Sequence, residues 1–454
     1  MNSSFEADAP AAGIDADSAL RNAYRSSEWR ILPILFALWM LAWVDRANVA
    51  FAKLQMLPDL GFSETVYGFG AGLFFLGYVV MGVPSSMIQS RVGARATISA
   101  IALGWGVTSV AMMFVKSTSM FYALRFLLGA FEAGFYPGVI LYLNQWFPTQ
   151  RRTRNFSIFH SAAICSTVAV GLTGGFVLDH MTGLWGLAGW RWMFLVQAVP
   201  TILLSGVVFA ILPDGPDAAR WLSGEQRRLI RMDLERDRKR FISPATRSTS
   251  LLSNPVTWVL AATYFGILTS NAALSFFTPT ILSEAGFGGY GAIGNVIAAI
   301  CVLGAVGNIA FSSFVSRYQD IRLACVIASA VSVSSIVVLA LVWHDSRVAT
   351  FTTLVLALAG TGAGISLFWQ IPVRFMDSKA ATLGVPLISS IANVAGFLTP
   401  WLIGYVRDIS GTYASGFFSA AGAQALAAAI LLVGVPLLVR RQQSAVRMSE
   451  SEPA

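Results

Sequence analysis

The sequence contains little charge. Asp, Glu, Lys and Arg together make up only 12% of its 454 residues, about half of the share that is usual in a soluble domain. Hydrophobic residues, in contrast, make up 56%. This composition excludes a soluble enzyme and indicates a membrane protein.

Cysteine is also scarce. The three cysteines, Cys165, Cys301 and Cys325, all lie in apolar stretches, where a free thiol behaves as a small hydrophobic group. Neither a disulfide framework nor a metal cluster is predicted. No nucleophile with a His partner is recognisable either, so we expect neither an enzyme nor a bound metal or cofactor.

The N-terminal segment lacks the apolar core of a signal peptide. Acidic residues stand at positions 6, 8, 15 and 17 instead, so a cleaved leader is not expected. We expect residues 1–29 to form a loose cytoplasmic tail.

Twelve apolar stretches are long enough to cross a membrane, since about 20 helical residues span roughly 30 Å of hydrocarbon. The alternating pattern of a membrane barrel is absent, so these spans are predicted to be α-helices. The predicted spans are 30–52, 66–89, 96–115, 119–143, 156–178, 190–212, 256–280, 290–315, 322–343, 349–374, 382–406 and 413–439.

One long hydrophilic segment, 214–253, divides the spans into two sets of six. The two sets also resemble each other at an offset of 225 or 226 residues: Gly61 matches Gly286, and Gly171 matches Gly396. Repetition of this kind is typical of transporters built from duplicated helix bundles, with the substrate site at their interface.

The predicted fold is therefore an all-α integral membrane protein with twelve transmembrane helices in two pseudo-symmetric six-helix bundles. The N-terminal bundle comprises residues 30–213 and the C-terminal bundle residues 254–440. Residues 214–253 form a cytoplasmic linker, and residues 441–454 form a cytoplasmic C-terminal tail.

Within the linker, Gly224–Lys239 is predicted to form an amphipathic helix, with Leu229, Met232 and Leu234 among its charges. Such a helix can bind lipid or a partner protein. A plain topogenic linker is the favoured interpretation.

Positive charge is concentrated on one side of the predicted membrane. Alternate segments, starting with the N-terminal one, hold most of the Lys and Arg residues, nine of them between Arg220 and Arg247. The segments on the other side hold only Lys53, Lys116, Arg191, Arg347 and Arg407. Both termini are therefore predicted to be cytoplasmic. The net charge of +8 reflects this bias, so nucleic-acid binding is not expected.

Four ionisable residues interrupt the apolar spans. Asp45 and Arg46 lie side by side in the first span, and Arg125 and Glu132 lie in the fourth. A charged side chain at the bilayer centre costs roughly 2.5–3.5 kcal/mol on insertion scales, so such residues usually line a cavity or pair with one another. The four together predict a polar, ion-handling centre.

Asp45 and Arg46 need separate surroundings, because successive helix residues point about 100° apart. We place Arg46 toward the central cavity, where its planar guanidinium is suited to holding a carboxylate. Asp45, on another face, is a candidate proton carrier.

Arg125 and Glu132 are seven residues apart, so they share a helix face but lie about 10 Å apart along the axis. They are not expected to pair with each other. Glycine and alanine around Glu132 leave room for a neighbouring helix or water, as a proton-exchanging carboxyl needs. The alternative is a static ion-pair network, which we disfavour because buried pairs stabilise weakly.

Polar residues in the C-terminal half are candidates to bind hydroxyl or ring groups of a substrate. They are Asn271 in the seventh span, Ser366, Trp369 and Gln370 in the tenth, and Ser389, Ser390 and Asn393 in the eleventh. For Ser389 and Ser390 an interhelical hydrogen bond is an equal alternative, and a large aromatic such as Trp369 is more often packing.

Two further features of the spans carry predictions. His160 is a possible proton relay, although a structural role is favoured for a lone His near the interface. Five prolines are predicted to kink their helices. They are Pro137, Pro279, Pro372, Pro386 and Pro400.

The segment Ser86–Arg95 (SMIQSRVGAR) resembles the loop signature of the major facilitator superfamily. An acidic residue is usual in that signature where this chain has Ser90. The salt bridge that the acid customarily makes to a neighbouring helix is therefore not expected here.

Four longer segments are similar to the anion:cation symporter family, whose members include tartrate, phthalate, hydroxyphenylacetate and sugar-acid permeases. The segments are Val44–Met56 (VDRANVAFAKLQM), Arg125–Pro148 (RFLLGAFEAGFYPGVILYLNQWFP), Leu212–Ser223 (LPDGPDAARWLS) and Ile388–Tyr405 (ISSIANVAGFLTPWLIGY). The resemblance covers nearly the whole chain after Arg30.

The resemblance implies roles for the charged residues. In the family the equivalent Asp and Glu are proton sites, which assigns proton coupling to Asp45 and Glu132. The equivalent Arg residues bind the anion or couple to the Glu, which assigns substrate binding to Arg46 and Arg125. Asn393 matches an Asn that the family uses.

The expected function is that of a proton-coupled symporter importing a small organic carboxylate (a sugar acid, dicarboxylate or aromatic acid) by alternating access. Its partners are expected to be the anion, protons as the coupling ion, and the lipid of a bacterial cytoplasmic (inner) membrane, with the protein a monomer. Alternatives are a proton-antiporting exporter of the same fold and a transporter-like sensor that binds without transport. The sequence leaves open which carboxylate is carried, the proton stoichiometry and the resting conformation.

Overall fold

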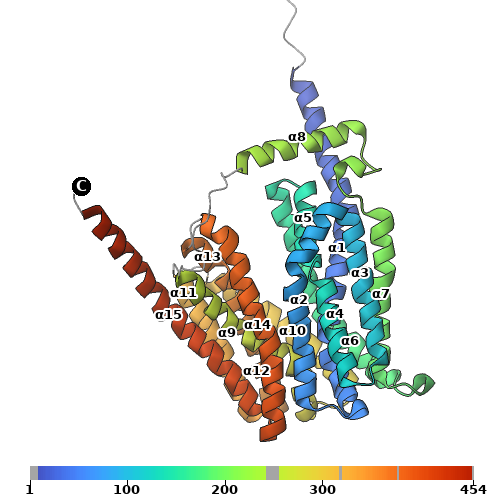
Figure 1. Ribbon diagram of the computed structural model, residues 1–454, viewed down its shortest axis with the longest axis vertical. Helices are drawn as coiled ribbons and strands as arrows, with labels where there is room; N and C mark the ends of the chain where they lie inside the picture. Colours follow the sequence, from blue (N-terminus) through green and yellow to red (C-terminus); the bar gives the residue numbers. More distant parts are fainter. Residues whose placement is uncertain (1–8, 242–254, 316–319, 376–377, 452–454) are drawn as a thin grey trace, which may run out of the picture.

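The computed structural model describes residues 9–241, 255–315, 320–375 and 378–451 (Figure 1). These ranges are mostly helical and contain no β-strand. The N-terminal half consists of α1 (Ala9–Leu60), α2 (Glu64–Val92), α3 (Ala94–Ala111), α4 (Thr118–Glu132), α5 (Phe135–Trp146), α6 (Thr149–His180) and α7 (Gly189–Ile211). After α8 (Gly224–Phe241), the C-terminal half consists of α9 (Pro255–Glu284), α10 (Tyr290–Val315), α11 (Ile321–Val342), α12 (Arg347–Phe368), α13 (Gln370–Phe375), α14 (Ser378–Ser410) and α15 (Ala414–Ser451).

Twelve helical segments are long and apolar enough to cross a membrane, which confirms the predicted fold. Two of them are interrupted, the fourth between α4 and α5 and the tenth between α12 and α13. Pro137 and Pro372 follow these breaks. A proline lacks the amide hydrogen and clashes with the carbonyl group four residues earlier. For Pro137 this is the carbonyl of Ala133, and for Pro372 that of Phe368. The regular helix stops at these positions. The other three prolines lie inside the continuous helices α9 and α14.

Helix α1 is much longer than the first predicted span. It begins at Ala9, so the loose tail expected for residues 1–29 is wrong from that residue onward. Ala23, Tyr24 and Ser27 are buried, and the hydroxyl of Tyr24 donates a hydrogen bond to Asp233 of α8 at 2.7 Å. These contacts give the segment the packing partners that a free tail lacks.

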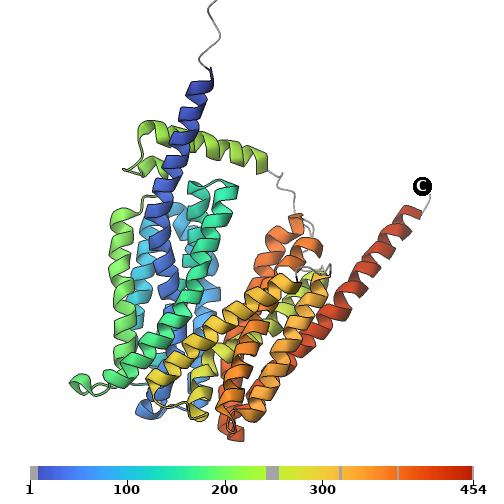
Figure 2. The ribbon, with the colours of Figure 1, turned by 180° about the vertical axis from the view of Figure 1, so that it is seen from behind.

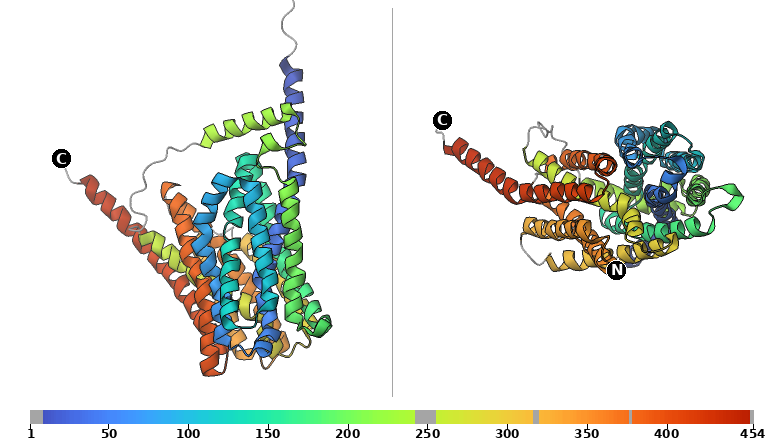
Figure 3. Two further views of the ribbon diagram at one scale, coloured as in Figure 1. Left: turned by 45° about the vertical axis from the view of Figure 1, so that its right-hand side comes forward. Right: turned by 90° about the horizontal axis from the view of Figure 1, so that it is seen from below.

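Helix α8 lies across the ends of the N-terminal helices (Figures 1 and 3). The structure confirms the amphipathic helix expected at Gly224–Lys239. Among the side chains of α8 whose burial is described, Ile230 is the fully buried one, while Met232 is exposed. Asp237 accepts hydrogen bonds from the backbone amide and hydroxyl of Thr149 at 3.0 and 2.9 Å. The described part of the linker is therefore docked on the N-terminal half.

The two halves repeat one helix-ending motif. Gly61 after α1 and Gly286 after α9 have φ angles of 64° and 74°, a conformation that favours glycine. In each case the following Phe62 or Phe287 donates its amide to the carbonyl five residues earlier, at 3.1 and 3.2 Å. This is the Schellman motif, and it gives the predicted repeat a structural basis.

The halves are joined in a pseudo-symmetric way. Helix α6 packs along α10, and its counterpart α14 packs along α2, as Figure 2 shows for the first pair. Gly171 of α6 and Gly294 of α10 are so close that a Cβ atom on Gly294 would lie 2.0 Å from the carbonyl oxygen of Gly171. Gly396, the predicted counterpart of Gly171, lies against the ring of Phe75.

The hydrophobic cores show at which end the halves are joined. One core combines both halves and includes Phe51, Tyr67, Phe277 and Ile403. Two other cores are each confined to one half. The halves therefore share packing near the α1–α2 and α14–α15 turns and diverge toward α8 and the termini (Figures 1 and 2).

Candidate functional site

Asp45 is enclosed within the N-terminal half. Its Oδ1 atom accepts hydrogen bonds from Ser109 of α3 at 2.7 Å and from Asn48 at 3.2 Å. The side chain is fully buried, and Oδ2 has no hydrogen-bond partner among the described residues. Asp45 thus faces α3, and Oδ2 is a position at which the carboxyl can carry a proton.

Arg46 points to another neighbour, helix α4. Its Nε atom donates to Oε1 of Glu132 at 2.5 Å, and its Nη2 atom contacts the same oxygen. Glu132 is buried, whereas 16% of the Arg46 side chain remains exposed. The structure therefore brings the predicted anion-binding residue and a predicted proton-coupling residue into direct contact.

Aromatic rings surround the guanidinium of Arg46. Its Cζ atom lies 5.0–5.5 Å from the ring centroids of Trp39, Trp43, Phe74 and Tyr78. Ring faces attract a cation, so these side chains hold the planar group in a fixed orientation. A fixed guanidinium on a partly exposed side chain is suited to binding a carboxylate.

Arg125 is held by the backbone of α2. Its Nε and Nη2 atoms donate to the carbonyl oxygens of Gly70 and Ala71 at 3.4 and 3.3 Å. The side chain is fully buried, and its Cζ atom lies 5.3 Å from the ring of Phe74. Arg46 contacts the same ring, so Phe74 links the two guanidinium groups.

Glu132 is the last residue of α4, directly before the break to α5. The space predicted beside it is occupied by a neighbouring helix, because a Cβ atom on Gly129 would lie 1.9 Å from the carbonyl oxygen of Phe74 in α2. Oε2 of Glu132 has no hydrogen-bond partner in the described part of the chain.

Of the C-terminal candidates, Trp369 lies in an aromatic group. Its indole nitrogen donates to the hydroxyl of Tyr264 at 3.2 Å, and Tyr264 stacks on Phe368 with ring centroids 4.7 Å apart. Trp369 is partly exposed.

The other C-terminal candidates differ in their hydrogen bonding. Asn393 donates to the carbonyl oxygen of Ser389 at 2.9 Å, and Ser366 donates to that of Gly362 at 3.0 Å. Both bonds lie within the residue's own helix. No hydrogen bond or ion pair engages Asn271 or Gln370 among the residues that the structure describes, which leaves their amide groups available.

Tyr136 of α5 packs beside the aromatic rings that face Arg46. Its ring centroid lies 5.2 Å from that of Trp39, and Trp39 contacts the guanidinium of Arg46. His160 contacts the ring of Tyr136 with centroids 6.2 Å apart and that of Trp39 with centroids 6.1 Å apart. The possible relay residue therefore lies in the aromatic group beside the buried ion pair, with no hydrogen bond to a carboxyl group within the described ranges.

Lys53 was expected in a loop, but it lies within α1 and is buried. Its ammonium group lies 2.7 Å from Glu64 and donates to the hydroxyl of Tyr413 at 2.9 Å. That hydroxyl donates to Glu64 at 2.5 Å. The rings of Tyr67 and Phe277 also contact the ammonium, at 4.9 and 4.6 Å from their centroids. Lys53, Glu64 and Tyr413, hereafter the Lys53 cluster, join the two halves.

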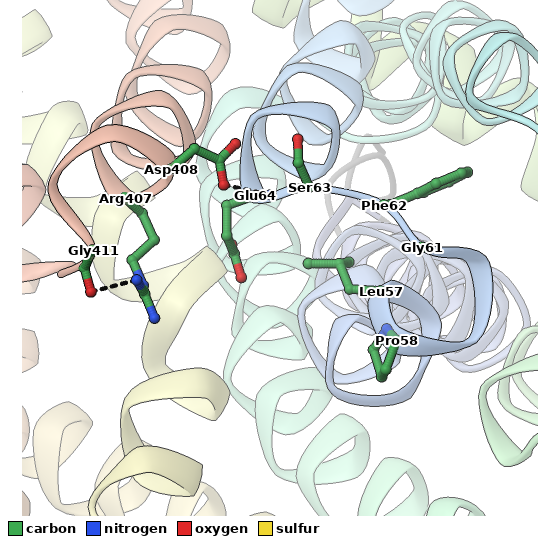
Figure 4. A pocket seen from close by; sticks show the side chains of 9 residues that line it. All are labelled: Leu57, Pro58, Gly61, Phe62, Ser63, Glu64, Arg407, Asp408 and Gly411. Atoms are coloured by element: carbon green, nitrogen blue, oxygen red, sulfur yellow. Dashed lines mark hydrogen bonds between the residues drawn. The ribbon is translucent and has the colours of Figure 1, made fainter.

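A polar pocket of 580 Å³ lies beside the Lys53 cluster and is lined by residues of both halves, among them Glu64, Arg407 and Asp408 (Figure 4). Asp408 accepts hydrogen bonds from the amides of Glu64 and Thr65 at 3.2 and 2.8 Å. Arg407 donates to the carbonyl oxygen of Gly411. The pocket therefore belongs to the end at which the halves are joined, and the Arg46–Glu132 ion pair does not line it.

A bundle of twelve apolar helices with buried charges is the arrangement expected of a membrane transporter. The sequence matches the Major Facilitator Superfamily over residues 34–400, and the chain belongs to this superfamily. It is a multi-pass membrane transporter and not an enzyme.

Several named relatives match most of the chain. The chain is 35% identical to a candidate metabolite transport protein, NicT of Pseudomonas putida, over 94% of this chain and 98% of that protein. It is 36% identical to a candidate tartrate transporter of Agrobacterium vitis, over 89% and 92%. It is 31% identical to a quinolone resistance transporter of Acinetobacter baumannii, over 88% and 92%.

Among solved structures, a bacterial homologue of the human lysosomal transporter Spinster, in an inward-facing and unoccupied conformation, matches 92% of this chain and 98% of its own. The TM-score is 0.73 and the sequence identity 16%, so the likeness concerns the fold. The resemblance to the superfamily and to tartrate permeases, drawn above from short segments, is confirmed by these comparisons.

Proposed function

We propose that this protein is a proton-coupled symporter that imports a small organic carboxylate by alternating access. The observation that carries the proposal is the ion pair between Arg46 and Glu132, in which an anion-binding group is occupied by a carboxyl that can take up a proton. The tartrate transporter among its relatives supports an organic acid as the substrate. A sugar acid, a dicarboxylate and an aromatic acid all belong to this class.

The ion pair provides a coupling mechanism. While Glu132 is ionised, it occupies the guanidinium of Arg46 and competes with an incoming carboxylate. When Glu132 takes up a proton, the substrate carboxylate can replace the lost negative charge. In both states, with ionised Glu132 or with bound substrate, the charge of Arg46 is paired. An unpaired buried charge would cost several kcal/mol. Proton binding and anion binding therefore favour each other.

Asp45 is assigned a second proton. Ser109 fixes one of its oxygens, and the other has no partner among the described residues. Two protons with a monovalent anion carry one net positive charge inward, which the membrane potential favours by about 2.3 kcal/mol per 100 mV.

The remaining candidates bind the rest of the substrate in this proposal. Arg46 holds the carboxylate, and Arg125 supports it through the shared ring of Phe74. The polar residues of the C-terminal half then select among carboxylates. They are Asn271, Ser366, Trp369, Gln370 and Asn393.

We place both termini in the cytoplasm and the protein, as a monomer, in the inner membrane of a bacterium. With this orientation the Lys53 cluster faces the outside, and the arrangement described above corresponds to an inward-facing state. Substrate and protons enter after this outer end opens. They leave toward the cytoplasm after it closes again.

Uptake into proteoliposomes tests the proposal. With labelled carboxylates of the three classes, we expect accumulation only when the outside is more acidic than the lumen. Equal uptake with and without the imposed proton gradient would contradict the proposed proton coupling.

A proton-antiporting exporter is the second candidate, and the quinolone resistance transporter among the relatives favours it. The same vesicles distinguish the two directions. A proton antiporter accumulates substrate when the lumen is acidic, because protons that leave the lumen are exchanged for substrate that enters it. A transporter-like sensor would bind the carboxylate without accumulating it in either gradient.

A further inference from the structure

A basic pocket of 520 Å³ lies between the start of α1 and the start of α6, outside the proposed transport site. Its lining contains four arginines and one glutamate, so it has an excess of three positive charges. The lining residues are Arg21, Asn22, Arg25, Glu28, Trp29, Arg151 and Arg154.

One arginine is fixed, and the other three are available. Arg151 forms an ion pair with Glu28 at 3.3 Å, and its Cζ atom lies 4.7 Å from the ring of Tyr24. Arg21, Arg25 and Arg154 are exposed. No hydrogen bond or ion pair engages these three guanidinium groups in the described part of the chain. Each offers five N–H donors and stays protonated.

The pocket lies next to the start of the first apolar run of the sequence. The first apolar run starts at Ile31, and Trp29, which lines the pocket, is 72% exposed. An exposed tryptophan at the end of a transmembrane segment is typical of the layer of lipid headgroups. The three available arginines thus point to a ligand at this depth.

We propose that this pocket binds the phosphate of an anionic phospholipid headgroup. Guanidinium groups bind phosphate oxygens through paired hydrogen bonds, and both α1 and α6 contribute arginines to the lining of the pocket. Basic pockets between helices at the membrane surface are suited to such headgroups. Free phosphate has the same chemistry, but the exposed ring of Trp29 provides an apolar contact that only a lipid uses. Orientation of the chain in the membrane requires positive charge on this side, but it does not require that the charges converge on one pocket.

Native mass spectrometry of the detergent-purified protein tests the proposal. The protein is incubated with dioleoyl phosphatidylglycerol, with dioleoyl phosphatidylcholine or with inorganic phosphate, and bound molecules are counted. We expect phosphatidylglycerol to bind about tenfold more tightly than phosphatidylcholine, and the double variant Arg21→Gln, Arg154→Gln to lose this preference. The matched control is Arg228→Gln, Arg236→Gln, which removes two exposed arginines of α8 outside the pocket and should keep the preference.

Three outcomes would overturn the proposal. One is an equal loss of preference in both double variants, which would indicate a general effect of charge. Another is unchanged binding in the pocket variant. The third is displacement of the lipid by equimolar inorganic phosphate, which would indicate a site for a free anion. Thermal unfolding of the lipid-free variants verifies that they are folded, and Arg21→Lys, Arg154→Lys, which keeps the charge, should retain part of the preference.

Discussion

Arg46 and Glu132 form an ion pair between α1 and α4, although Arg46 directly follows Asp45 in the chain. Asp45 is bound by Ser109 and Asn48 instead. The two charges of the first span therefore belong to separate networks. Of these two networks, only that of Arg46 contains a cationic side chain, and this side chain is partly exposed. The proposed coupling therefore depends on the Arg46–Glu132 pair.

Glu132→Gln tests the coupling directly. The amide cannot exchange a proton, and it leaves Arg46 without a competing charge. We expect proton-driven accumulation to be lost, while counterflow between equal substrate pools is retained. Both are measured in the same proteoliposomes.

Glu225→Gln is the matched control for this variant, because Glu225 is exposed on α8. It should accumulate substrate as the parent protein does. Accumulation in Glu132→Gln without counterflow would show that Glu132 binds substrate and has no part in proton coupling.

Arg46→Lys tests the role of the planar guanidinium. Lysine keeps the positive charge next to Glu132 but cannot hold a carboxylate with two parallel hydrogen bonds. Loss of one charged hydrogen bond weakens binding by about 1.5–3 kcal/mol, so we expect the KM for uptake to rise roughly 10- to 100-fold. Arg228→Lys on the exposed face of α8 should leave KM unchanged. An unaltered KM in Arg46→Lys would place the carboxylate elsewhere.

Much of the fold could be predicted because its signals are local. The membrane spans could be predicted from runs of apolar residues. The repeat could be recognised at Gly61 and Gly286 because both positions have a positive φ angle, which favours glycine. The four charged residues of the first and fourth spans could be recognised as a functional centre because a charged side chain in lipid has a high free-energy cost.

The partners of these charges could not be predicted, because they depend on how helices cross. Lys53 shows the reason. Hydropathy ended the first span at residue 52, but α1 continues to Leu60, and Lys53 is buried by contacts with Tyr413, 360 residues further along the chain. The one available signal was that Lys53 follows Arg46 by seven residues, two helical turns, on the same helix face.

The start of α11 gives a prediction that depends on pH. Asp320 accepts hydrogen bonds from the side chain and amide of Arg322, at 3.1 and 3.0 Å for Nε and the backbone N. The side-chain hydrogen bond from Arg322 holds the pKa of Asp320 below its ordinary value. A carboxyl whose pKa is lower in the folded than in the unfolded protein stabilises the fold at any pH above its unfolded-state pKa. This stabilisation is lost as the pH falls through the folded-state pKa.

Asp320→Ala should therefore lower the stability at pH 7 by about 1 kcal/mol, as removal of a helix cap does. The difference from the parent protein should shrink as the pH falls below about 4. Asp320→Ser, which keeps a capping oxygen, should retain most of the stability. Thermal unfolding in detergent measures all three, and a loss in Asp320→Ala that does not change with pH would assign the effect to helix propensity.

The Lys53 cluster should determine how often the outer end opens. Lys53→Met leaves Glu64 without its cation, and breaking such a buried pair costs about 3 kcal/mol. We expect the halves to separate at this end, which lengthens the distance between spin labels at Leu60→Cys and Ser410→Cys in a background without the native cysteines. Lys116→Met, at an exposed lysine outside the cluster, should leave the distance distribution unchanged. An unchanged distribution in Lys53→Met would mean that apolar packing alone holds this end closed.

The contact between Gly171 and Gly294 tests whether closure at this end is part of the transport cycle. An alanine Cβ at position 294 would lie 2.0 Å from a backbone oxygen, and backbone cannot move aside as a flexible side chain can. Gly294→Ala should therefore keep α6 and α10 apart, lengthen the same label distance and lower the maximal uptake rate by about tenfold, which corresponds to a barrier higher by roughly 1.4 kcal/mol. Gly206→Ala in α7 is the control, since a Cβ there would meet no atom within 4 Å, and it should transport at the parental rate. If Gly294→Ala also transports at that rate, the close approach of α6 and α10 is not required in the cycle, and alternating access must use a different closing contact.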